Sequence, residues 1–204
     1  MKRWHKYEQY LLSGLWHVHT DLTDGSETIT DLVEFASNNN YPLIGFTEHI
    51  RRSPTYDFQE FYQKAKNVAC ESDLKCVVGC EAKVLNQQGE LDISNQDLGL
   101  SDIVYAAYHG TPFSKSEYLD SVYSMLENPR VDVWAHPLVY PSKSGFSISN
   151  EVLSDLFSYA KRNNVLIEKN LRYCLPRTFS ETVHENFDIL GYDVHQLNEL
   201  GHKI

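Results

Sequence analysis

Histidine and carboxylate side chains recur along this chain at positions where short apolar runs end. The first pair is His17 and His19, and the last is Asp193 and His195. Side chains two residues apart point to the same face of a β-strand, so each pair can hold one metal ion or two adjacent ions. Imidazole and carboxylate groups together are typical ligands of divalent zinc, manganese and iron. Five further candidates lie between the pairs: Asp24, His49, Glu81, His109 and His136.

A single His-x-His pair on a strand is more often a surface pair or a core histidine than a pair of metal ligands. Histidine and carboxylate residues recur in this chain where successive apolar runs give way to polar loops, and this recurrence favours metal ligands. We therefore predict one polynuclear metal site that is assembled from the whole length of the sequence.

Length and charge limit the other possibilities. With 204 residues and 42% hydrophobic content, the chain can bury a full core, and we expect one domain over residues 1–204. The formal net charge of −10 argues against binding to long nucleic acids, which reward clustered lysine and arginine. A small phosphorylated substrate remains compatible with this charge.

Neither a membrane segment nor a cysteine framework is indicated. No apolar run approaches about 18 residues, and the basic start Met1–Lys6 is not followed by an apolar segment, so we expect a cytoplasmic protein without membrane attachment. The cysteines form no C-x-x-C pair, which favours reduced thiols over a cysteine-based zinc site. They are Cys70, Cys76, Cys80 and Cys174.

Strand-like and helix-like segments alternate along the chain. Strands are expected at 14–19, 43–47, 75–80, 102–108, 131–135 and 165–168, and a less clear one at 187–190. Helices are expected at 28–38, 58–71, 114–127 and 150–163, and a hairpin turn at 88–90. Such alternation implies a parallel sheet with crossover connections. A closed barrel gathers the polar strand ends best, and a doubly wound open sheet is the second choice because it would spread them along a line.

The polar segments, in this order, resemble the motifs of the PHP (polymerase and histidinol phosphatase) family of metal-dependent phosphoesterases. Each motif alone is a weak signal, whereas seven in order over nearly the whole chain are a strong one. They are His17-Val18-His19-Thr20 with Asp24-Gly25, Thr47-Glu48-His49, Gly79-Cys80-Glu81, His109, Ala135-His136-Pro137, Glu168-Lys169-Asn170 and Gly191-Tyr192-Asp193-Val194-His195. The resemblance implies an α/β fold, a distorted (βα)7 TIM-like barrel with its metal site at the C-terminal ends of the strands.

The resemblance also implies a set of ligands for up to three divalent ions, which we expect to be zinc, manganese or iron. Carried over residue by residue, the nine ligands are His17, His19, Asp24, His49, Glu81, His109, His136, Asp193 and His195. Glu81 is expected to bridge two metals. Glu81, Asp193 and His195 are the predicted catalytic residues, with His195 as the candidate proton donor to the leaving group.

Three features depart from the family pattern. Glu48 stands before the histidine of the second motif, where the family commonly has aspartate, and Tyr192 stands where a small serine is usual. Between Asn170 and Asp193 only the stretch 180–186 can form a helix, so the last helix of the barrel wall is expected to be missing. A partner subunit that covers this edge would make the protein a homo-oligomer.

The expected reaction is hydrolysis of a small phosphate monoester, as in a histidinol phosphatase. Divalent ions lower the pKa of bound water towards neutrality and neutralise phosphate charge, so a hydroxide is available for attack on phosphorus. Cations near the strand ends are candidates for substrate binding, namely Arg172, Arg51 and Lys83. An exposed arginine on a loop is nevertheless more often simply solvated.

Three alternatives remain open from the sequence. A nuclease or nucleotide phosphatase of the same fold would need a positively lined groove, for which this acidic chain gives little indication. A non-catalytic metal-binding module would be marked by lost ligands, and all nine positions are filled. A hydrolase that acts on a carbon centre would use the same metal chemistry.

Overall fold

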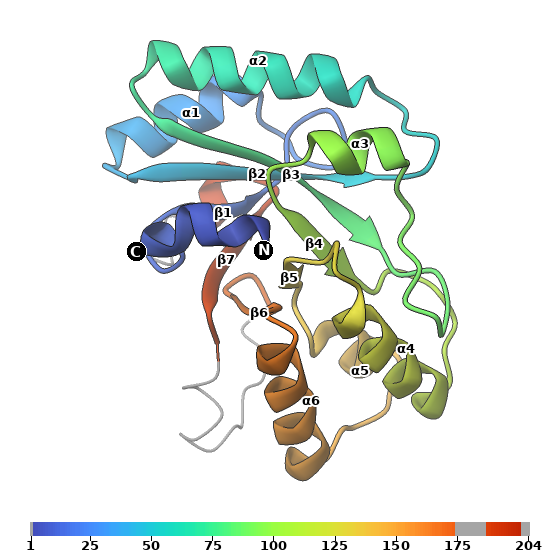
Figure 1. Cartoon of the computed structure of the whole chain (residues 1–204). Helices are drawn as coiled ribbons and strands as arrows, with labels where there is room; N and C mark the ends of the chain where they lie inside the picture. The colour runs from blue at the N-terminus through green and yellow to red at the C-terminus, as the bar shows by residue number, and fades with distance from the viewer. Residues whose placement is uncertain (1, 174–186, 201–204) are drawn as a thin grey trace.

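The computed structural model describes residues 2–173 and 187–200, and within them seven parallel strands close into a barrel (Figure 1). Neighbours along the chain are neighbours in the barrel, and β1 pairs with β7 to close it. The strands are β1 (Leu15–Val18), β2 (Leu43–Ile50), β3 (Lys75–Lys83), β4 (Val104–Ala107), β5 (Val133–Trp134), β6 (Leu166–Asn170) and β7 (Ile189–Val194). The predicted barrel is confirmed, and the open sheet is wrong.

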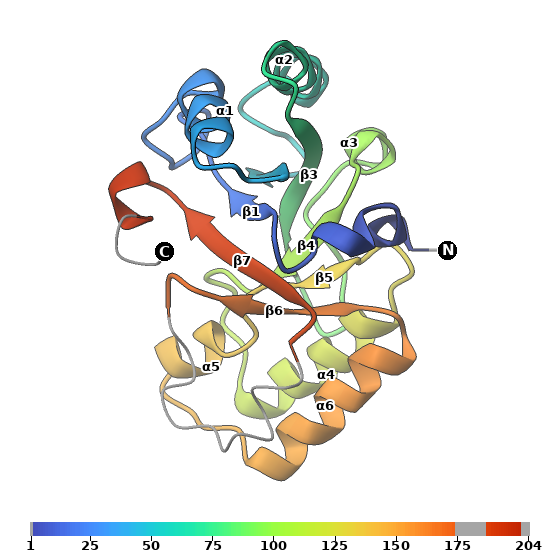
Figure 2. The same ribbon diagram turned by 90° about the vertical axis from the view of Figure 1, so that its left-hand side faces the viewer.

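Helices surround the barrel on its outer face (Figures 1 and 2). They are α1 (Ile29–Asn38), α2 (Phe58–Glu71), α3 (Asn95–Leu100), α4 (Lys115–Glu127), α5 (Val139–Lys143) and α6 (Asn150–Arg162), with two 3-10 helices, η1 (Arg3–Tyr10) and η2 (Leu197–Glu199). α1 and α4 begin at capping boxes, in which Thr28 and Ser114 each exchange hydrogen bonds with the residue three positions later. η1, α3 and α5 were not expected from the sequence.

The N-terminal end of the barrel interior is filled by apolar side chains. Trp16 and Tyr105 are fully buried there, together with residues such as Leu43 and Val77. η1 lies across this end, and its aromatic residues Trp4, Tyr7 and Tyr10 pack against the same cluster. This end of the barrel is therefore a closed hydrophobic core.

η1 is fastened to the barrel by polar contacts of its first residues. The Arg3 guanidinium lies 3.3 Å from the Asp132 carboxylate, and the Trp4 indole nitrogen donates a hydrogen bond of 2.9 Å to the carbonyl of Asn164. Asp132 is buried directly before β5, and Asn164 lies two residues before β6. η1 is therefore attached to the N-terminal ends of two neighbouring strands.

Some predicted boundaries move in the structure. β7 runs from Ile189 to Val194, later than the predicted 187–190, so Asp193 lies inside the strand. The turn at 88–90 forms, with one antiparallel bridge between Val84 and Leu91 and with Gly89 at a φ of 67°. The helix expected at 180–186 lies outside the described residues, as does Cys174. Among helices in the described ranges, none has the length and apolar character to cross a membrane.

Candidate metal centre

The C-terminal ends of the strands bring all nine predicted ligands together. They form four overlapping groups in which the candidate ligand atoms lie within 4.8 Å of one another. The groups are His19, Asp24, His49 and His195; His17, Glu81 and His136; His17, His19 and Asp193; and His49, Glu81 and His109. Residues that are up to 178 positions apart in sequence, His17 and His195, therefore share one site because the barrel closes through β1 and β7.

Glu81 lies at the centre of the cluster, with its side chain 1% exposed. Its Oε1 is 2.7 Å from Nε2 of His136 and 3.1 Å from Nε2 of His109. Its Oε2 faces the other side of the site, 2.9 Å from Nδ1 of His49 and 3.8 Å from Nε2 of His19. One carboxylate thus spans two groups of imidazoles, which is the arrangement that a bridging ligand requires.

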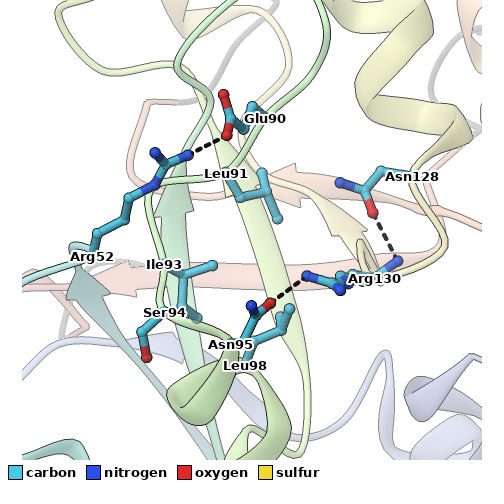
Figure 3. A pocket seen from close by; sticks show the side chains of 9 residues that line it. All are labelled: Arg52, Glu90, Leu91, Ile93, Ser94, Asn95, Leu98, Asn128 and Arg130. Carbon is cyan, nitrogen blue, oxygen red and sulfur yellow. Dashed lines mark hydrogen bonds and ion pairs between the residues drawn. The ribbon is translucent and has the colours of Figure 1, made fainter.

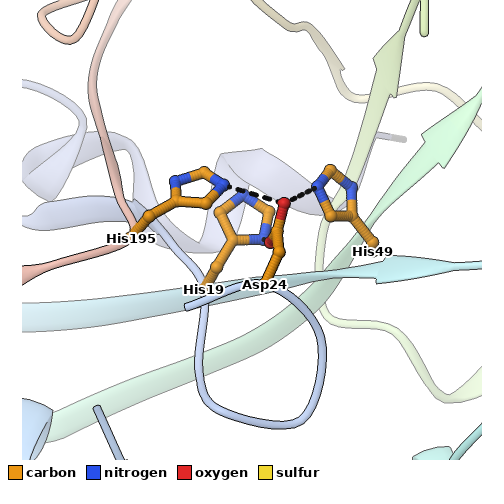
Figure 4. Close-up of side chains that lie close together, drawn as sticks. All are labelled: His19, Asp24, His49 and His195. Carbon is orange, nitrogen blue, oxygen red and sulfur yellow. Dashed lines mark hydrogen bonds and ion pairs between the residues drawn. The ribbon is translucent and has the colours of Figure 1, made fainter. Parts of the chain in front are cut away.

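Asp24 forms the outer part of the site, where it lies between two histidines (Figure 4). Its Oδ2 is 3.2 Å from Nε2 of both His49 and His195. Asp24 comes from the loop after β1, and Glu48 holds that loop in place. Glu48 is fully buried and accepts a hydrogen bond from the backbone N–H of Thr20 at 2.5 Å and another from the Thr23 hydroxyl.

Glu48 therefore acts on the loop, since its hydrogen bonds go to loop residues. Burial raises the pKa of this carboxyl to about 7, although the bonds from Thr23 and Thr20 oppose that rise. The longer glutamate side chain, where the family commonly has aspartate, reaches both of these donors. With glutamate at position 48, His49 still lies within the cluster.

Three of the clustered residues have a strained backbone. In the described ranges six residues other than glycine have a positive φ, and three of these directly follow a helix end, where such a conformation is common. Those three are Asn40, Asp73 and Asn164. The other three belong to the cluster, with φ values of 62° for His17, 28° for His136 and 52° for Asp193. Such conformations cost about 1–3 kcal/mol each and concentrate at functional sites.

The strain at His17 has a direct effect on the site. The pairing of β1 with β2 and with β7 shifts between Trp16 and Val18, so His17 is the extra residue of a β-bulge in β1. Opposite it, two residues of β7 lie between the pairs that Trp16 makes with Gly191 and Val18 makes with Val194. Both strands bend at the point where they deliver candidate ligands.

Glu168 lies behind the cluster and orients it. Its Oε1 is 2.5 Å from Nδ1 of His17, and its Oε2 accepts a hydrogen bond of 2.7 Å from the backbone N–H of His136. Asn170 donates to Glu168 at 3.2 Å and to Oδ2 of Asp193 at 3.1 Å. A proton on Nδ1 of His17, held by Glu168, leaves Nε2 free to face the cluster, which is how carboxylates orient metal-binding histidines.

The sequence analysis gave Glu168 and Asn170 no role beyond their place in a motif. Their signal was the same as that of the other pairs, two polar residues at i and i+2 at the end of a strand. The position of Glu168 depends on a neighbouring strand as well, because a Cβ atom at Gly191 would lie 1.8 Å from its Oε1. Glycine at 191 therefore makes room for the carboxylate under His17.

The imidazoles of the cluster fit divalent cations. Buried ring nitrogens of four histidines lack a hydrogen-bond partner in the described structure, and they include both nitrogens of His19. They are Nε2 of His17, Nδ1 and Nε2 of His19, Nδ1 of His49 and Nε2 of His109. A buried polar atom without a partner costs about 1–3 kcal/mol, and a bound cation would satisfy these atoms.

At His19 and Glu81, the net effect of burial and the surrounding charges favours the forms that bind a cation. At His17, His49 and His136 the nearby carboxylates outweigh burial and raise the pKa, so a cation would displace a proton from each of these rings. Burial, followed by the positive charge of His17, holds the pKa of His19 well below its usual value, so this ring stays neutral and keeps a lone pair for a cation. Burial disfavours ionisation of Glu81, but His109 and His17 outweigh burial and hold the pKa of Glu81 well below its usual value. Neutral imidazole beside ionised carboxylate is the donor set of zinc, manganese and iron sites.

Of the three predicted substrate-binding cations, Arg172 lies closest to the cluster. Its guanidinium contacts the His195 ring, donates to the carbonyl oxygen of Asp193 at 3.3 Å, and lies 3.5 Å from the Glu199 carboxylate. Arg51 instead lies with Nε 3.7 Å from the carboxylate of Asp92.

Lys83 ends β3, two residues after Glu81, and is partly buried. In residues 2–173 and 187–200, the side chains of Arg51 and Lys83 form no ion pair with any of the nine candidate ligands. Arg172 is thus the predicted cation that the fold places at the site.

Among the described residues, a small cavity of about 10 Å³ is lined by His136 and Glu168. Two larger cavities near the strand ends differ in whether they reach the cluster. The first has a volume of about 370 Å³ and is lined by His109, by the loop that follows it, and by α5. The second, of about 410 Å³, is lined by Arg52 and Arg130 among others and by none of the nine candidate ligands (Figure 3). There Arg52 pairs with Glu90, and Arg130 donates to the side chain of Asn95 at 2.8 Å.

Comparison with known proteins places this geometry in a family. The sequence model of the PHP domain family matches residues 16–187 of this chain. A probable phosphatase of Clostridium botulinum is 29% identical over 206 residues, an alignment that covers 91% of this chain and 79% of the relative. The DNA polymerase/3'-5' exonuclease PolX of Bacillus subtilis is 25% identical over 170 residues, which cover 78% of this chain and 29% of that protein.

Two solved structures share the fold. A two-domain protein from Bacteroides vulgatus, described as containing a predicted PHP-like metal-dependent phosphoesterase, aligns with a TM-score of 0.53 at 17% identity, over 93% of this chain and 53% of that chain. An HpcH/HpaI aldolase from Desulfitobacterium hafniense aligns with a TM-score of 0.55 at 12% identity, over 98% of this chain and 92% of that chain. Both likenesses concern the barrel fold alone.

Proposed function

The chain belongs to the PHP domain family, and on that premise we propose that it is a metal-dependent phosphatase that hydrolyses a small phosphate monoester. The observation that carries the proposal is the buried cluster of imidazoles and carboxylates with unsatisfied ring nitrogens at the C-terminal end of the barrel. A pocket of about 370 Å³ beside His109 has the size of a small-molecule site.

The nine clustered residues would hold up to three divalent ions, with Glu81 between the two imidazole groups that its oxygens face. When bound, such ions supply Lewis acidity towards phosphate oxygens and lower the pKa of water. Zinc, manganese and iron all suit this donor set.

The protein's own residues orient the reacting groups. Glu168 fixes the ring of His17 and the backbone of His136, and Asn170 fixes the Asp193 carboxylate. Arg172 lies at the edge of the cluster, where its guanidinium can bind a phosphate oxygen of the substrate in a bidentate or single contact. These fixed positions reduce the reorganisation that the reaction requires.

Protonation of the leaving alkoxide needs a separate group. His195 is our candidate, because its side chain is partly open to solvent, 12% exposed, and lies beside both Asp24 and Asp193. A histidine side chain can give a proton to an oxygen within hydrogen-bond reach.

The test is phosphate release by the purified protein after separate reconstitution with manganese, zinc or iron. The substrate panel contains histidinol phosphate, nucleotides, sugar phosphates and short oligonucleotides, and the control variants are Asp193→Asn and His17→Ala. Release from one class of monoester, lost in both variants, is the expected result.

Other outcomes of this panel would contradict the proposal. Release of nucleotides from oligonucleotides but no release from monoesters would make the protein a nuclease. Silence across the panel from protein that contains its metals would indicate a non-catalytic metal-binding module or a hydrolase that acts on carbon.

A further inference from the structure

The pocket beside the cluster contains a cation that belongs neither to the nine candidate ligands nor to the predicted substrate-binding residues. Lys143, at the end of α5, lines the pocket together with His109 and the loop residues that follow it. Among the described residues, no carboxylate forms an ion pair with Lys143. Its Nζ instead lies 4.9 Å from the centre of the Tyr173 ring.

This lysine is set apart from the phosphate position. Lys143 and His136 both contact the Tyr173 ring, whose centre lies 4.9 Å from the Lys143 Nζ and 5.9 Å from the centre of the His136 ring. Arg172, in contrast, contacts His195 and Asp193 directly. A phosphoryl group bound at the cluster would therefore meet Arg172, and Lys143 would face the part of a substrate that extends into the pocket beside His109.

Hydrogen bonds and a ring contact hold Tyr140 and the loop after His109, which both line the pocket. The Tyr140 hydroxyl donates a hydrogen bond of 2.7 Å to the carbonyl of Thr111 and accepts one of 2.8 Å from the N–H of Phe113. The Tyr140 ring also stacks on the buried ring of Tyr118, with centres 5.1 Å apart. The loop after His109 is thus held against α5, and a pocket formed in advance lowers the entropic cost of binding.

We propose that Lys143 selects substrates whose leaving group carries a second negative charge, so that the preferred substrate is a small phosphate monoester with an additional carboxylate or phosphoryl group. This inference rests on the proposed phosphatase function and names the substrate class of the same site. The shared chemistry is an anion that binds Lys143 while the scissile phosphate lies at the metal centre. Neither Arg51 nor Lys83 lines this pocket.

The experiment uses hydrolysis of p-nitrophenyl phosphate by the metal-loaded protein as a reporter and measures inhibition constants. 3-Phosphoglycerate and glycerol 3-phosphate form a matched pair, since they differ only in a carboxylate and a hydroxymethyl group. Propane-1,3-diol bisphosphate and its monophosphate form a second pair, which tests a phosphoryl group in the same role.

In the wild-type protein we expect the member that carries the second anionic group to bind about tenfold more tightly in at least one pair, as expected for a charge-assisted hydrogen bond. Lys143→Met should remove this advantage, and Lys143→Arg should keep most of it. Lys64→Met, on the exposed face of α2, is the control for loss of a surface charge and should keep the full advantage. The pair with the larger effect identifies the anion.

Equal inhibition by both members of both pairs, or an advantage that survives in Lys143→Met, would overturn this inference and leave the phosphatase function standing. No hydrolysis of the reporter or of the wider panel would instead overturn the proposed function, and this inference with it. Thermal unfolding of each variant shows that any loss comes from binding rather than from misfolding, because the Lys143 side chain is exposed.

Discussion

The barrel interior has an apolar end and a polar end, and the same seven strands supply both. At the N-terminal end, Trp16 and Tyr105 are fully buried among aliphatic side chains under η1. At the C-terminal end, His17, directly after Trp16 in β1, and Glu81 in β3 belong to a cluster with unsatisfied ring nitrogens and strained backbone. The boundary is sharp, for the rings of His17 and Tyr105 are in contact with centres 5.0 Å apart.

This difference separates stability from function. Burial of apolar surface stabilises the N-terminal end, whereas buried polar atoms without partners and positive φ values cost free energy at the C-terminal end. We therefore expect changes at the apolar end to lower stability first, and changes at the polar end to lower metal binding and activity with little loss of stability in the metal-free protein.

The largest effect on stability is expected from Trp16→Ala. Truncation of this buried ring removes a large apolar surface and leaves a cavity, so the free energy of unfolding should fall by about 3–5 kcal/mol. Denaturant unfolding of the metal-free protein measures this change. A loss below 1 kcal/mol would show that the apolar end does not hold the barrel together.

At the polar end, Glu81→Gln should lower phosphatase activity more than about 100-fold, because the carboxylate is close to ligand atoms of both imidazole groups. The amide has the same shape, so the unfolding temperature of the metal-free variant should change by less than about 4 °C, the equivalent of 1 kcal/mol. Activity and calorimetry on one preparation test both parts. Full activity in this variant would exclude Glu81 as a bridging ligand.

Removal of metal should destabilise the protein through the polar end alone. A metal at 100 times its dissociation constant adds about 2.7 kcal/mol of stability, which corresponds to roughly 5–10 °C in unfolding temperature for a chain of this size. We expect treatment with a chelator to lower the unfolding temperature by this amount and re-addition of manganese or zinc to restore it. Trp16→Ala should retain the same metal-dependent shift if it still folds.

Alanine substitutions at two glycines that flank Trp16 compare the apolar end and the polar end at neighbouring positions. Gly45 and Gly191 both pair with Trp16, one on β2 and the other on β7. A Cβ atom at Gly45 would lie 2.3 Å from the Trp16 ring, whereas one at Gly191 would lie 1.8 Å from the carboxylate of Glu168. The same substitution by alanine thus disturbs packing in one case and ligand orientation in the other.

Gly45→Ala should lower the free energy of unfolding by about 1–3 kcal/mol through overpacking, with activity unchanged below the unfolding temperature. Gly191→Ala should weaken metal binding or activity about 10–100-fold, as expected when a carboxylate that orients a ligand is displaced. Metal titration measures the change in metal affinity of both variants, and denaturant unfolding measures the change in their free energy of unfolding. Equal effects of the two substitutions on metal binding would contradict the division of the barrel into two ends.

Much of this arrangement could be predicted from the sequence, because the residues at which apolar runs end indicate where the strands end. Apolar runs that stop at histidine or carboxylate indicated six strands and, less clearly, a seventh at 187–190, and the nine candidate residues lie at or after the ends of such runs. The parallel barrel then requires these ends to meet on one side. The ligand roles of the nine residues stay predictions until metal is measured.

The rest depends on contacts between strands, which a single sequence does not reveal. The role of Glu168 requires the glycine at 191 on the next strand, and the bulge at His17 appears only in the pairing of β1 with both of its neighbours. η1 was not expected from the sequence, although Trp4, Tyr7 and Tyr10 recur every three residues, which is the period of a 3-10 helix, and these residues pack over the apolar end. Arg51 and Lys83 follow strand ends as Arg172 does, but only Arg172 contacts the cluster.

The most direct test of the account is a metal titration in which bound metal and phosphate release are measured on the same samples. Chelator-treated protein is titrated with manganese, and with zinc in parallel, while hydrolysis of p-nitrophenyl phosphate is followed. The account predicts that activity is absent at the start, rises with bound metal, and levels off when the cluster is full, at no more than three ions per chain. Activity that does not depend on bound metal, or a chain that binds no metal with its cluster intact, would contradict it.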